Sequence, residues 1–276
     1  MLNFNGKLIP VSTFSISNNN RAFKYGDAIF ETILVLQNKV VFWEDHYFRL
    51  MASMRMLRME IPLEFTLEYL QEEILKTVNA TNSLNTRVRL SIYRKDGGYY
   101  APTTNQVDFL IEVSENLYQT KEAYTIDLYK DFYNYSGLLS TVKTTNRMLN
   151  TMASIYMNEN ELDNCILMNE QKSIVEATNA NVFIIKDCVI KTPKLEDGCI
   201  KGIARKKVIE ILKKHPDYII EETSISPFEM QKADEVFLTN TIMGVQPVTS
   251  YKKKKYTTII GKKIAASYNL LKVTSN

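Results

Sequence analysis

The alternation of apolar and polar positions predicts that the first 115 residues form a mixed domain of strands and helices. Residues 3–10 hold a turn at Asn5-Gly6 between short β-prone pieces, which predicts a hairpin. Residues 29–36 and 40–43 predict a second hairpin, and residues 86–93 and 107–113 predict two further strands. Apolar positions recur at spacings of three and four over residues 44–59, which predicts an amphipathic helix that stops before Pro62. Residues 63–78 predict a second helix.

The second half of the chain is richer in strand patterns. A polar connection over residues 114–122 is the best candidate for a boundary, so we expect domains at 1–115 and 123–276 with an interdomain loop at 116–122. Helices are predicted at 146–158 and 202–214. Strands are predicted at 124–129, 166–169, 181–185, 189–191, 218–222 and 235–239. This order of elements predicts an α+β fold with two domains, of which the second has helices on its outside.

Composition limits the classes of function. The chain has 276 residues, 45% hydrophobic and 24% charged, with a net charge of +3, which is too small to indicate a nucleic-acid partner. The basic run Lys252–Lys255 is interpreted as a solvated surface. Cys165, Cys188 and Cys199 show no C-x-x-C spacing, which favours reduced thiols and a cytoplasmic location. No signal peptide is visible, and no apolar stretch approaches the roughly twenty residues of a membrane span.

Several kinds of catalytic equipment are absent from the sequence. The two histidines, His46 and His215, are far apart in the chain, so neither a histidine-based metal site nor a nucleophile–histidine triad is indicated. None of the nine glycines forms a dinucleotide or P-loop motif. An enzyme without these groups needs a cofactor that is held by other means, and we expect no metal.

A series of short motifs occurs along the chain in a fixed order. The motifs are Arg21-x-Phe23-x-Tyr25-Gly26-Asp27-x-x-Phe30-Glu31-Thr32, His46-x-x-Arg49-Leu50, Lys143-x-x-Asn146, Glu176 with Asn181-Val182-Phe183, Thr192-Pro193, Gly202-Ile203-x-Arg205 and Ala233-Asp234-Glu235-Val236-Phe237. With these motifs the chain resembles the class IV aminotransferases, the fold type IV group of pyridoxal phosphate enzymes. The group includes branched-chain aminotransferases, D-amino acid aminotransferases and 4-amino-4-deoxychorismate lyases. The similarity covers about residues 3 to 270 and implies a strand-rich pseudo-barrel as the second domain.

The resemblance implies a role for each of the residues around the cofactor. Lys143 is expected to form the Schiff base and then to act as the base at Cα, and Glu176 to pair with the pyridine nitrogen. Arg49 is expected to grip the phosphate, because a guanidinium suits paired hydrogen bonds to phosphate oxygens. The remaining expected cofactor contacts are the ring-packing Ile200, the turn residues Gly202, Ile203 and Ala204 at a helix start, and Asn240 and Thr241.

Local patterns favour the lyase, which forms 4-aminobenzoate and pyruvate and serves folate biosynthesis. Phe30-Glu31-Thr32 and Lys143-x-x-Asn146-Arg147 resemble lyase patterns, and Thr239-Asn240-Thr241-Ile242 departs from the Gly-Thr-Ala of branched-chain enzymes. The alternative is an aminotransferase for branched-chain L- or D-amino acids with 2-oxoglutarate as acceptor. Arg89 matches a position that holds a substrate carboxylate, and a dicarboxylate substrate would use it equally well. The expected substrate contacts are Phe30, Thr32, Arg89, Arg94 and Ile242.

The resemblance also implies a homodimer that acts on a small, amino-acid-like substrate, without nucleic-acid or membrane partners. Two non-enzymatic alternatives remain: a cofactor-binding protein that has lost turnover, and a nucleic-acid-binding module that uses the basic run. Against the first, Lys143, Glu176 and Arg49 are all present. Against the second, a basic run alone gives only salt-sensitive, non-specific contacts.

Overall fold

The computed structural model describes residues 1–81 and 83–274, and the chain divides into two compact units. The first unit consists of Met1–Leu117 and Lys143–Asn146, and the second of Tyr118–Val142 and Arg147–Thr274. The second unit therefore begins within the segment 116–122 that we expect to join two domains. The short segment that carries Lys143 belongs to the first unit, although it follows this connection in the sequence.

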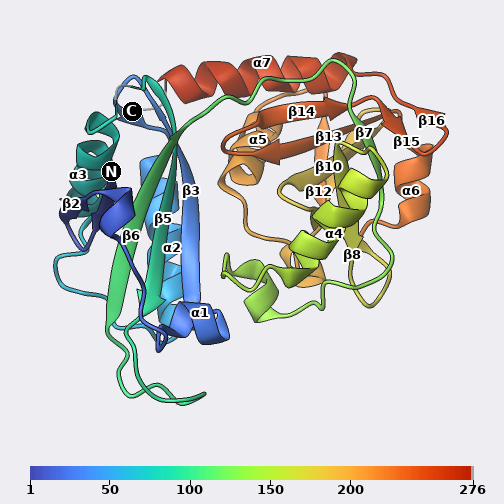
Figure 1. Ribbon diagram of the computed structural model, residues 1–276. Coiled ribbons are helices and arrows are strands. Elements are labelled where there is room, and N and C mark those ends of the chain that lie inside the picture. Colours follow the sequence, from blue (N-terminus) through green and yellow to red (C-terminus); the bar gives the residue numbers. More distant parts are fainter. Residues whose placement is uncertain (82, 275–276) are drawn as a thin grey trace. The chain divides into compact units, whose positions relative to one another are not determined.

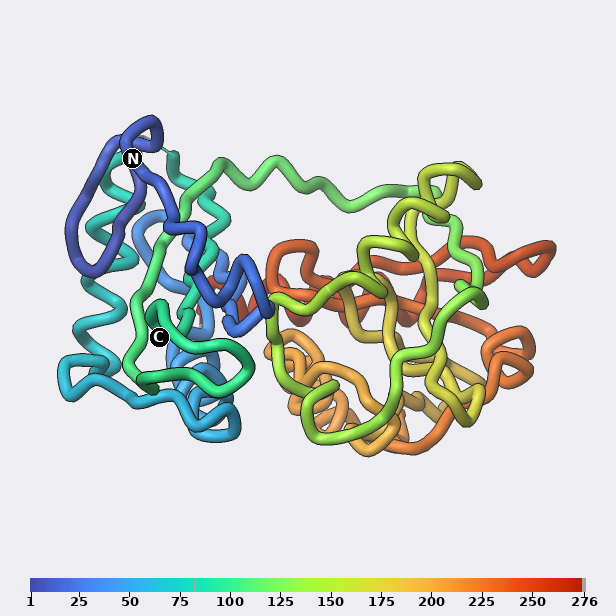
Figure 2. The backbone as a smooth tube through the Cα atoms, turned by 60° about the horizontal axis from the view of Figure 1, so that its bottom comes forward, coloured from blue at the N-terminus to red at the C-terminus, as the bar shows by residue number. Residues whose placement is uncertain are grey.

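An antiparallel six-stranded sheet is the basis of the first unit, in the order β2-β1-β6-β5-β3-β4 (Figure 1). Both predicted hairpins are present, and the blue N-terminal hairpin lies beside the green strand β6 in Figure 2. In the register of these strands, Asn3 pairs with Ile111. The strands are β1 (Leu2–Phe4), β2 (Lys7–Ile9), β3 (Ala28–Leu36), β4 (Lys39–Val40), β5 (Asn85–Arg94) and β6 (Val107–Glu115).

Helices α2 (Trp43–Met56) and α3 (Leu67–Asn79) pack against this sheet. Helix α3 begins at Leu67 rather than at residue 63, because Thr66 caps it by accepting a hydrogen bond from the Tyr69 amide at 3.1 Å. Two shorter helices precede the long strands, η1 (Val11–Thr13) and α1 (Arg21–Tyr25). Along β3 the side chains at Ile29, Glu31 and Ile33 are buried, so a carboxylate occupies a position where the strand pattern otherwise places apolar residues.

Two five-stranded sheets form the second unit, in the orders β12-β11-β10-β13-β14 and β16-β15-β7-β8-β9. Most neighbouring strands are antiparallel, but β7 pairs in parallel with β8 and β15, and β11 with β12. The strands are β7 (Thr125–Leu128), β8 (Asn164–Met168), β9 (Ile174–Ala177), β10 (Asn181–Lys186), β11 (Val189–Thr192), β12 (Ile219–Glu222), β13 (Glu235–Asn240), β14 (Gly244–Val248), β15 (Ser250–Tyr251) and β16 (Lys254–Lys255).

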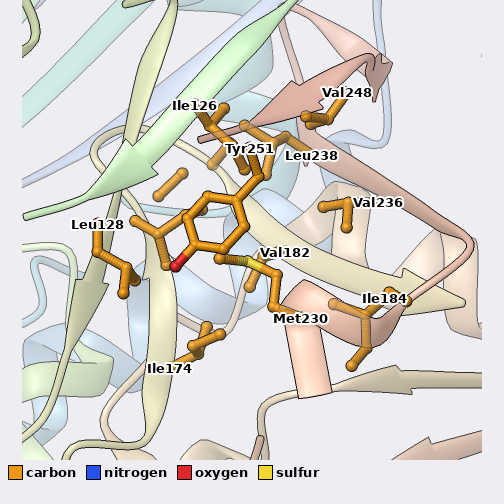
Figure 3. Close-up of a cluster of buried hydrophobic side chains, with 14 of the residues drawn as sticks. Ile126, Leu128, Ile174, Val182, Ile184, Met230, Val236, Leu238, Val248 and Tyr251 are labelled. Carbon is orange, nitrogen blue, oxygen red and sulfur yellow. The ribbon is translucent and has the colours of Figure 1, made fainter. Parts of the chain in front are cut away.

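The core of the second unit contains side chains from both of its sheets. In Figure 3 the ring of Tyr251, which is 1% exposed, lies among aliphatic side chains that include Val182 and Leu238 of the first sheet and Ile126 and Leu128 of the second. Such burial is the main favourable contribution to folding, at about 25 cal/mol per Å² of apolar surface. The helices of this unit are η2 (Leu138–Thr141), α4 (Met148–Glu159), η3 (Leu195–Asp197), α5 (Ile203–Lys213), α6 (Pro227–Lys232) and α7 (Ile259–Thr274).

The α+β class expected from the sequence is confirmed, with three sheets and helices packed against them. Elements near the C-terminus, from β14 to α7, were not predicted individually. Helix α7 packs on β13 and β14, so its position depends on contacts with strands that precede it in the chain. Among the described residues, no helix is both long enough and apolar enough to cross a membrane.

Candidate active site

Lys143 lies in a short segment that pairs with the edge of β3 in the first unit. The Phe30 amide donates to the Lys143 carbonyl at 3.0 Å, and the Thr145 amide donates to the Ala28 carbonyl at 3.0 Å. Between them, Ile29 and Thr144 form an antiparallel bridge. These backbone bonds fix the lysine backbone against one position of β3, and the Lys143 side-chain nitrogen lies 4.6 Å from the centroid of the Phe30 ring.

The glycine of the Tyr25-Gly26-Asp27 motif lies against the segment that carries the lysine. Gly26 ends α1 with a φ of 62°, in the left-handed region, and a Cβ atom there would collide with the Asn146 side chain. The Gly26 carbonyl accepts hydrogen bonds from the Thr145 hydroxyl at 3.1 Å and from the Asn146 amide at 3.4 Å. The motif around Gly26 and the Lys143-x-x-Asn146 motif are therefore parts of one local structure.

Arg49 is paired with a buried carboxylate one position beyond Phe30. The Arg49 guanidinium donates through Nε to Glu31 Oε1 at 2.8 Å and through Nη2 to Glu31 Oε2. His46, one turn earlier on α2, places its Nδ1 2.7 Å from Glu31 Oε2. The Glu31 and His46 side chains are 2% and 0% exposed, whereas the Arg49 side chain is 12% exposed. Two side chains of α2 thus hold one carboxylate of β3.

The charges in this cluster are decided by the neighbours of each group. Burial alone would raise the pKa of Glu31, but the charge of Arg49 and the hydrogen bonds from His46 and Arg49 outweigh it and lower this pKa to about 2. Burial lowers the pKa of His46, and the bond to Glu31 only partly opposes that shift. At neutral pH the cluster therefore contains an ionised Glu31, a cationic Arg49 and a neutral His46.

Arg89 on β5 lies over the same ring as Lys143. Its guanidinium carbon is 3.8 Å from the centroid of the Phe30 ring, a favourable cation–π distance. The side chain pairs with Glu112 at 3.9 Å, and burial lowers its pKa from the ordinary value. Thr32 is the partner of Arg89 in the β3–β5 register, so the expected substrate residues Phe30, Thr32 and Arg89 share one face of the sheet.

Arg94, which we expected to contact substrate, is used inside the first unit. Its guanidinium donates to Asp27 at 3.0 Å, to the Leu57 carbonyl at 2.8 Å, to the Arg58 carbonyl at 3.3 Å and to Asn105. The residue is 6% exposed. These contacts give Arg94 a structural role within the first unit, and its contact with substrate stays a prediction.

Glu176 is at the end of β9 in the second unit. It is 5% exposed, and its Oε2 accepts a hydrogen bond from the Ile200 amide at 2.8 Å. The Ile200 carbonyl accepts from the Asn181 side chain at 2.9 Å, which fixes the backbone of the loop before α5. A buried carboxylate whose position is fixed by a backbone amide is suited to holding a proton on a ring nitrogen.

The start of α5 has the properties of an anion site. Its N-cap residue is Gly202, which has no side chain that could accept a hydrogen bond from the first backbone amides of the helix. The first turn contains no acidic residue. A Cβ atom at Gly202 would collide with the Asn181 side chain, so only glycine allows this close approach. The backbone amides of Ile203 and Ala204 follow, in the part of a helix where the dipole favours an anion. This arrangement fits the phosphate role expected from the sequence.

The turn after β13 contains the last expected cofactor residues. Asn240 Oδ1 accepts hydrogen bonds from the Ile242 amide at 3.0 Å and the Met243 amide at 2.7 Å, and its Nδ2 donates to the Asn179 carbonyl. The Asn240 side chain therefore shapes the turn that contains Thr241 and Ile242. Among residues 1–81 and 83–274, no cluster of histidine, cysteine or carboxylate side chains has the makings of a metal site.

The residues present fit pyridoxal phosphate when each unit is considered by itself. The first unit supplies an amine at Lys143 and a guanidinium at Arg49, both fixed next to consecutive residues of β3. The second supplies a buried carboxylate at Glu176 and an uncapped helix start at Gly202. An amine for the aldehyde, a cation and helix amides for the phosphate and a carboxylate for the ring nitrogen are the donor set that the cofactor requires.

Comparison with known proteins shows which family the chain is similar to. The model described as "Amino-transferase class IV" matches residues 28–251. A probable branched-chain-amino-acid aminotransferase of Aquifex aeolicus (strain VF5) is 30% identical over 91% of this chain and 84% of its own. An aminodeoxychorismate lyase of Vibrio harveyi is 26% identical over 83% of this chain and 85% of its own. A crystal structure of a branched-chain aminotransferase from Thermoproteus uzoniensis with norvaline superposes with a TM-score of 0.91 at 24% identity, covering 100% of this chain and 95% of that one.

Proposed function

Because the chain belongs to the class IV aminotransferase family, we propose that it converts 4-amino-4-deoxychorismate to 4-aminobenzoate and pyruvate. Pyridoxal phosphate is the cofactor, and when bound it supplies a sink for the electron pair left by proton removal at the amine-bearing carbon. Lys143 carries the cofactor and acts as the base at that carbon. Glu176 keeps a proton on the ring nitrogen, and Arg49 with the start of α5 binds the phosphate.

The observation that carries the proposal is the arrangement of Lys143 and Arg89 on the Phe30 ring. The Lys143 side-chain nitrogen lies 4.6 Å from the ring centroid, and the Arg89 guanidinium carbon lies 3.8 Å from it. Arg89 can hold a substrate carboxylate, and Lys143, next to the same ring, is the neighbouring base. A substrate with an amine and a carboxylate on an unsaturated ring uses both groups.

Three stretches of sequence support the lyase over a transaminase. Phe30-Glu31-Thr32 replaces the Phe-Glu-Gly that the resemblance associates with branched-chain enzymes. Asn146-Arg147 follows the lysine where those enzymes tend to have Asn-Tyr, and the Arg147 guanidinium donates to the Val142 carbonyl at 2.9 Å. The turn at Thr241 lacks the Gly-Thr-Ala of the branched-chain pattern.

An amino acid aminotransferase is the second candidate, for a branched-chain L-amino acid or a D-amino acid with 2-oxoglutarate as acceptor. The observation that favours it is the 30% identity to a relative named as a probable branched-chain-amino-acid aminotransferase. Both reactions use Lys143, Glu176 and Arg49 in the same roles. They differ in the groups that contact the rest of the substrate.

A direct assay separates the two reactions. The cofactor-loaded protein is given freshly prepared aminodeoxychorismate, and 4-aminobenzoate is followed by chromatography. Lys143→Ala is the inactive comparison, and Lys130→Ala, an exposed lysine of the second unit, is the matched control. We expect product from the wild type and from Lys130→Ala but not from Lys143→Ala. Absence of product together with turnover of an amino acid and 2-oxoglutarate would replace the lyase by the aminotransferase.

A further inference from the structure

We propose that Glu31 is a positioning residue for the phosphate of the cofactor, acting through Arg49. Its carboxylate accepts hydrogen bonds from Nε and Nη2 of the Arg49 guanidinium, and these two parallel bonds fix the plane of the guanidinium. The inference rests on the proposed cofactor, because Arg49 has a phosphate to bind only if pyridoxal phosphate is present.

Glu31 follows directly after the residue of β3 that holds the Lys143 backbone. Phe30, the preceding residue, donates its backbone amide to the Lys143 carbonyl. Consecutive residues of β3 therefore hold the amine that carries the cofactor and the guanidinium that faces its phosphate. The strand sets the spacing between these two groups, and it does so through one backbone bond and one side chain.

His46 adds a third side-chain contact to the Glu31 carboxylate. Its Nδ1 lies 2.7 Å from Glu31 Oε2, whereas its Nε2 is buried without a hydrogen-bond partner among the described residues. A neutral imidazole in that setting carries its proton on Nδ1 and donates it to Glu31.

Arg49 itself is the most exposed member of the cluster. Its side chain is 12% exposed, against 2% for Glu31 and none for His46. The buried pair therefore lies behind the guanidinium, and Arg49 is the member that an anion can reach. A long side chain held from behind loses little conformational freedom when it binds phosphate, which is the benefit of preorganisation.

Comparison of pyridoxal phosphate with pyridoxal isolates the role of Glu31. Both ligands present the same aldehyde to Lys143, and only the first has a phosphate. The affinity of each is measured by absorbance titration of the wild type and of Glu31→Gln, Glu31→Asp and His46→Asn. We expect Glu31→Gln to reduce the preference for the phosphorylated ligand by about tenfold, at the lower end of the value of a charge-assisted contact. Glu31→Asp should also reduce this preference, because its carboxylate keeps the charge but the shorter side chain cannot reach the Arg49 guanidinium as well.

A double-mutant cycle with Arg49→Lys then tests the route of the effect. A lysine cannot donate two parallel hydrogen bonds to the Glu31 carboxylate as the Arg49 guanidinium does, so adding Glu31→Gln to Arg49→Lys should leave the ligand preference unchanged. An equal loss of affinity for both ligands in Glu31→Gln would show mere structural support and overturn the inference. A stronger preference for phosphate would overturn it too, since charge removal would then outweigh positioning. Failure of the wild type to bind either ligand would instead remove the proposed cofactor role.

Discussion

At the scale of single residues, Gly26 shows how a turn conformation positions a catalytic group. The residue has a φ of 62°, and the Asn146 side chain occupies the space that a Cβ atom would need. Gly26→Ala therefore adds backbone strain of roughly 1–2 kcal/mol and displaces the segment that carries Lys143. We expect a loss of cofactor affinity and of activity larger than the loss of thermal stability. Gly6→Ala is the matched control, with a φ of 81° and Tyr69 Oη, at 3.2 Å, as the atom nearest to the added Cβ. Equal effects of the two variants on cofactor affinity would contradict the assignment.

The lowered pKa values of Glu31 and His46 predict that the stability of the folded chain falls in acid. The pKa of Glu31 falls from 4.5 to about 2 in the folded chain, so the stability it contributes is present above pH 4.5 and is lost as the pH falls towards 2. The pKa of His46 is also lowered, so stability is already lost as the pH falls below its ordinary value of 6.5. Both groups therefore destabilise the folded chain as the pH falls. The lowered pKa of Glu31 corresponds to a contribution of roughly 3 kcal/mol to the free energy of unfolding at neutral pH.

The direction of the Glu31 pKa shift predicts how the stability of a variant with a neutral side chain at position 31 depends on pH. Glu31→Gln should lower the midpoint of thermal unfolding at pH 7, and its difference from the wild type should shrink as the pH falls from 5 to 3 because the native carboxylate then loses its advantage. Glu159→Gln, an exposed residue at the end of α4, serves as the control and should have little effect at either pH. A difference that stays constant with pH would show that Glu31 contributes through packing rather than through its charge.

At the scale of elements, helix α7 receives its cap from a strand. Its first turn has no acidic residue, but the Glu235 carboxylate on β13 accepts bonds from the Ile260 and Gly261 amides at 3.0 and 2.8 Å. The Thr257 hydroxyl is a third donor, at 3.1 Å. Glu235→Ala should lower the free energy of unfolding by about 2 kcal/mol, because charged hydrogen bonds to a buried acceptor are lost. Glu221→Ala, an exposed strand residue paired at 3.9 Å, should cost much less by the same chemical denaturation.

This long-range cap also explains what local patterns could predict. The strands β3, β5 and β6 were predicted close to their observed bounds, because alternating burial leaves its mark within each segment. Helix α7 was not, since the carboxylate that caps it and the strands that it covers lie elsewhere in the chain. The roles of Lys143, Glu176 and Arg49 came from a resemblance to a family and remain predictions. Pairing of Lys143 with β3 and of Arg49 with Glu31 depends on register between distant segments, which no local pattern contains.

At the scale of the whole molecule, the expected homodimer has a candidate contact in the loop after β5. Tyr99 and Tyr100 are 85% and 91% exposed, yet the backbone of this loop is held by Arg21, which donates to the Gly97 and Tyr99 carbonyls at 2.9 and 2.6 Å. A fixed backbone that presents two exposed aromatic rings is typical of a protein–protein contact. We therefore propose that these tyrosines lie in the interface between two copies of the chain.

Sedimentation velocity tests this contact at micromolar concentration. We expect the wild type to sediment as a dimer and the double variant Tyr99→Ser/Tyr100→Ser to shift towards the monomer, since aromatic side chains contribute strongly to interfaces. Phe228→Ser is the matched control, an aromatic residue 64% exposed on α6 of the second unit, and should leave the dimer intact. A monomeric wild type would remove the dimer itself. A double variant that remains a dimer and keeps normal stability would instead place the interface on another surface. The contacts of Arg21 with the loop would then serve only the fold of the single chain.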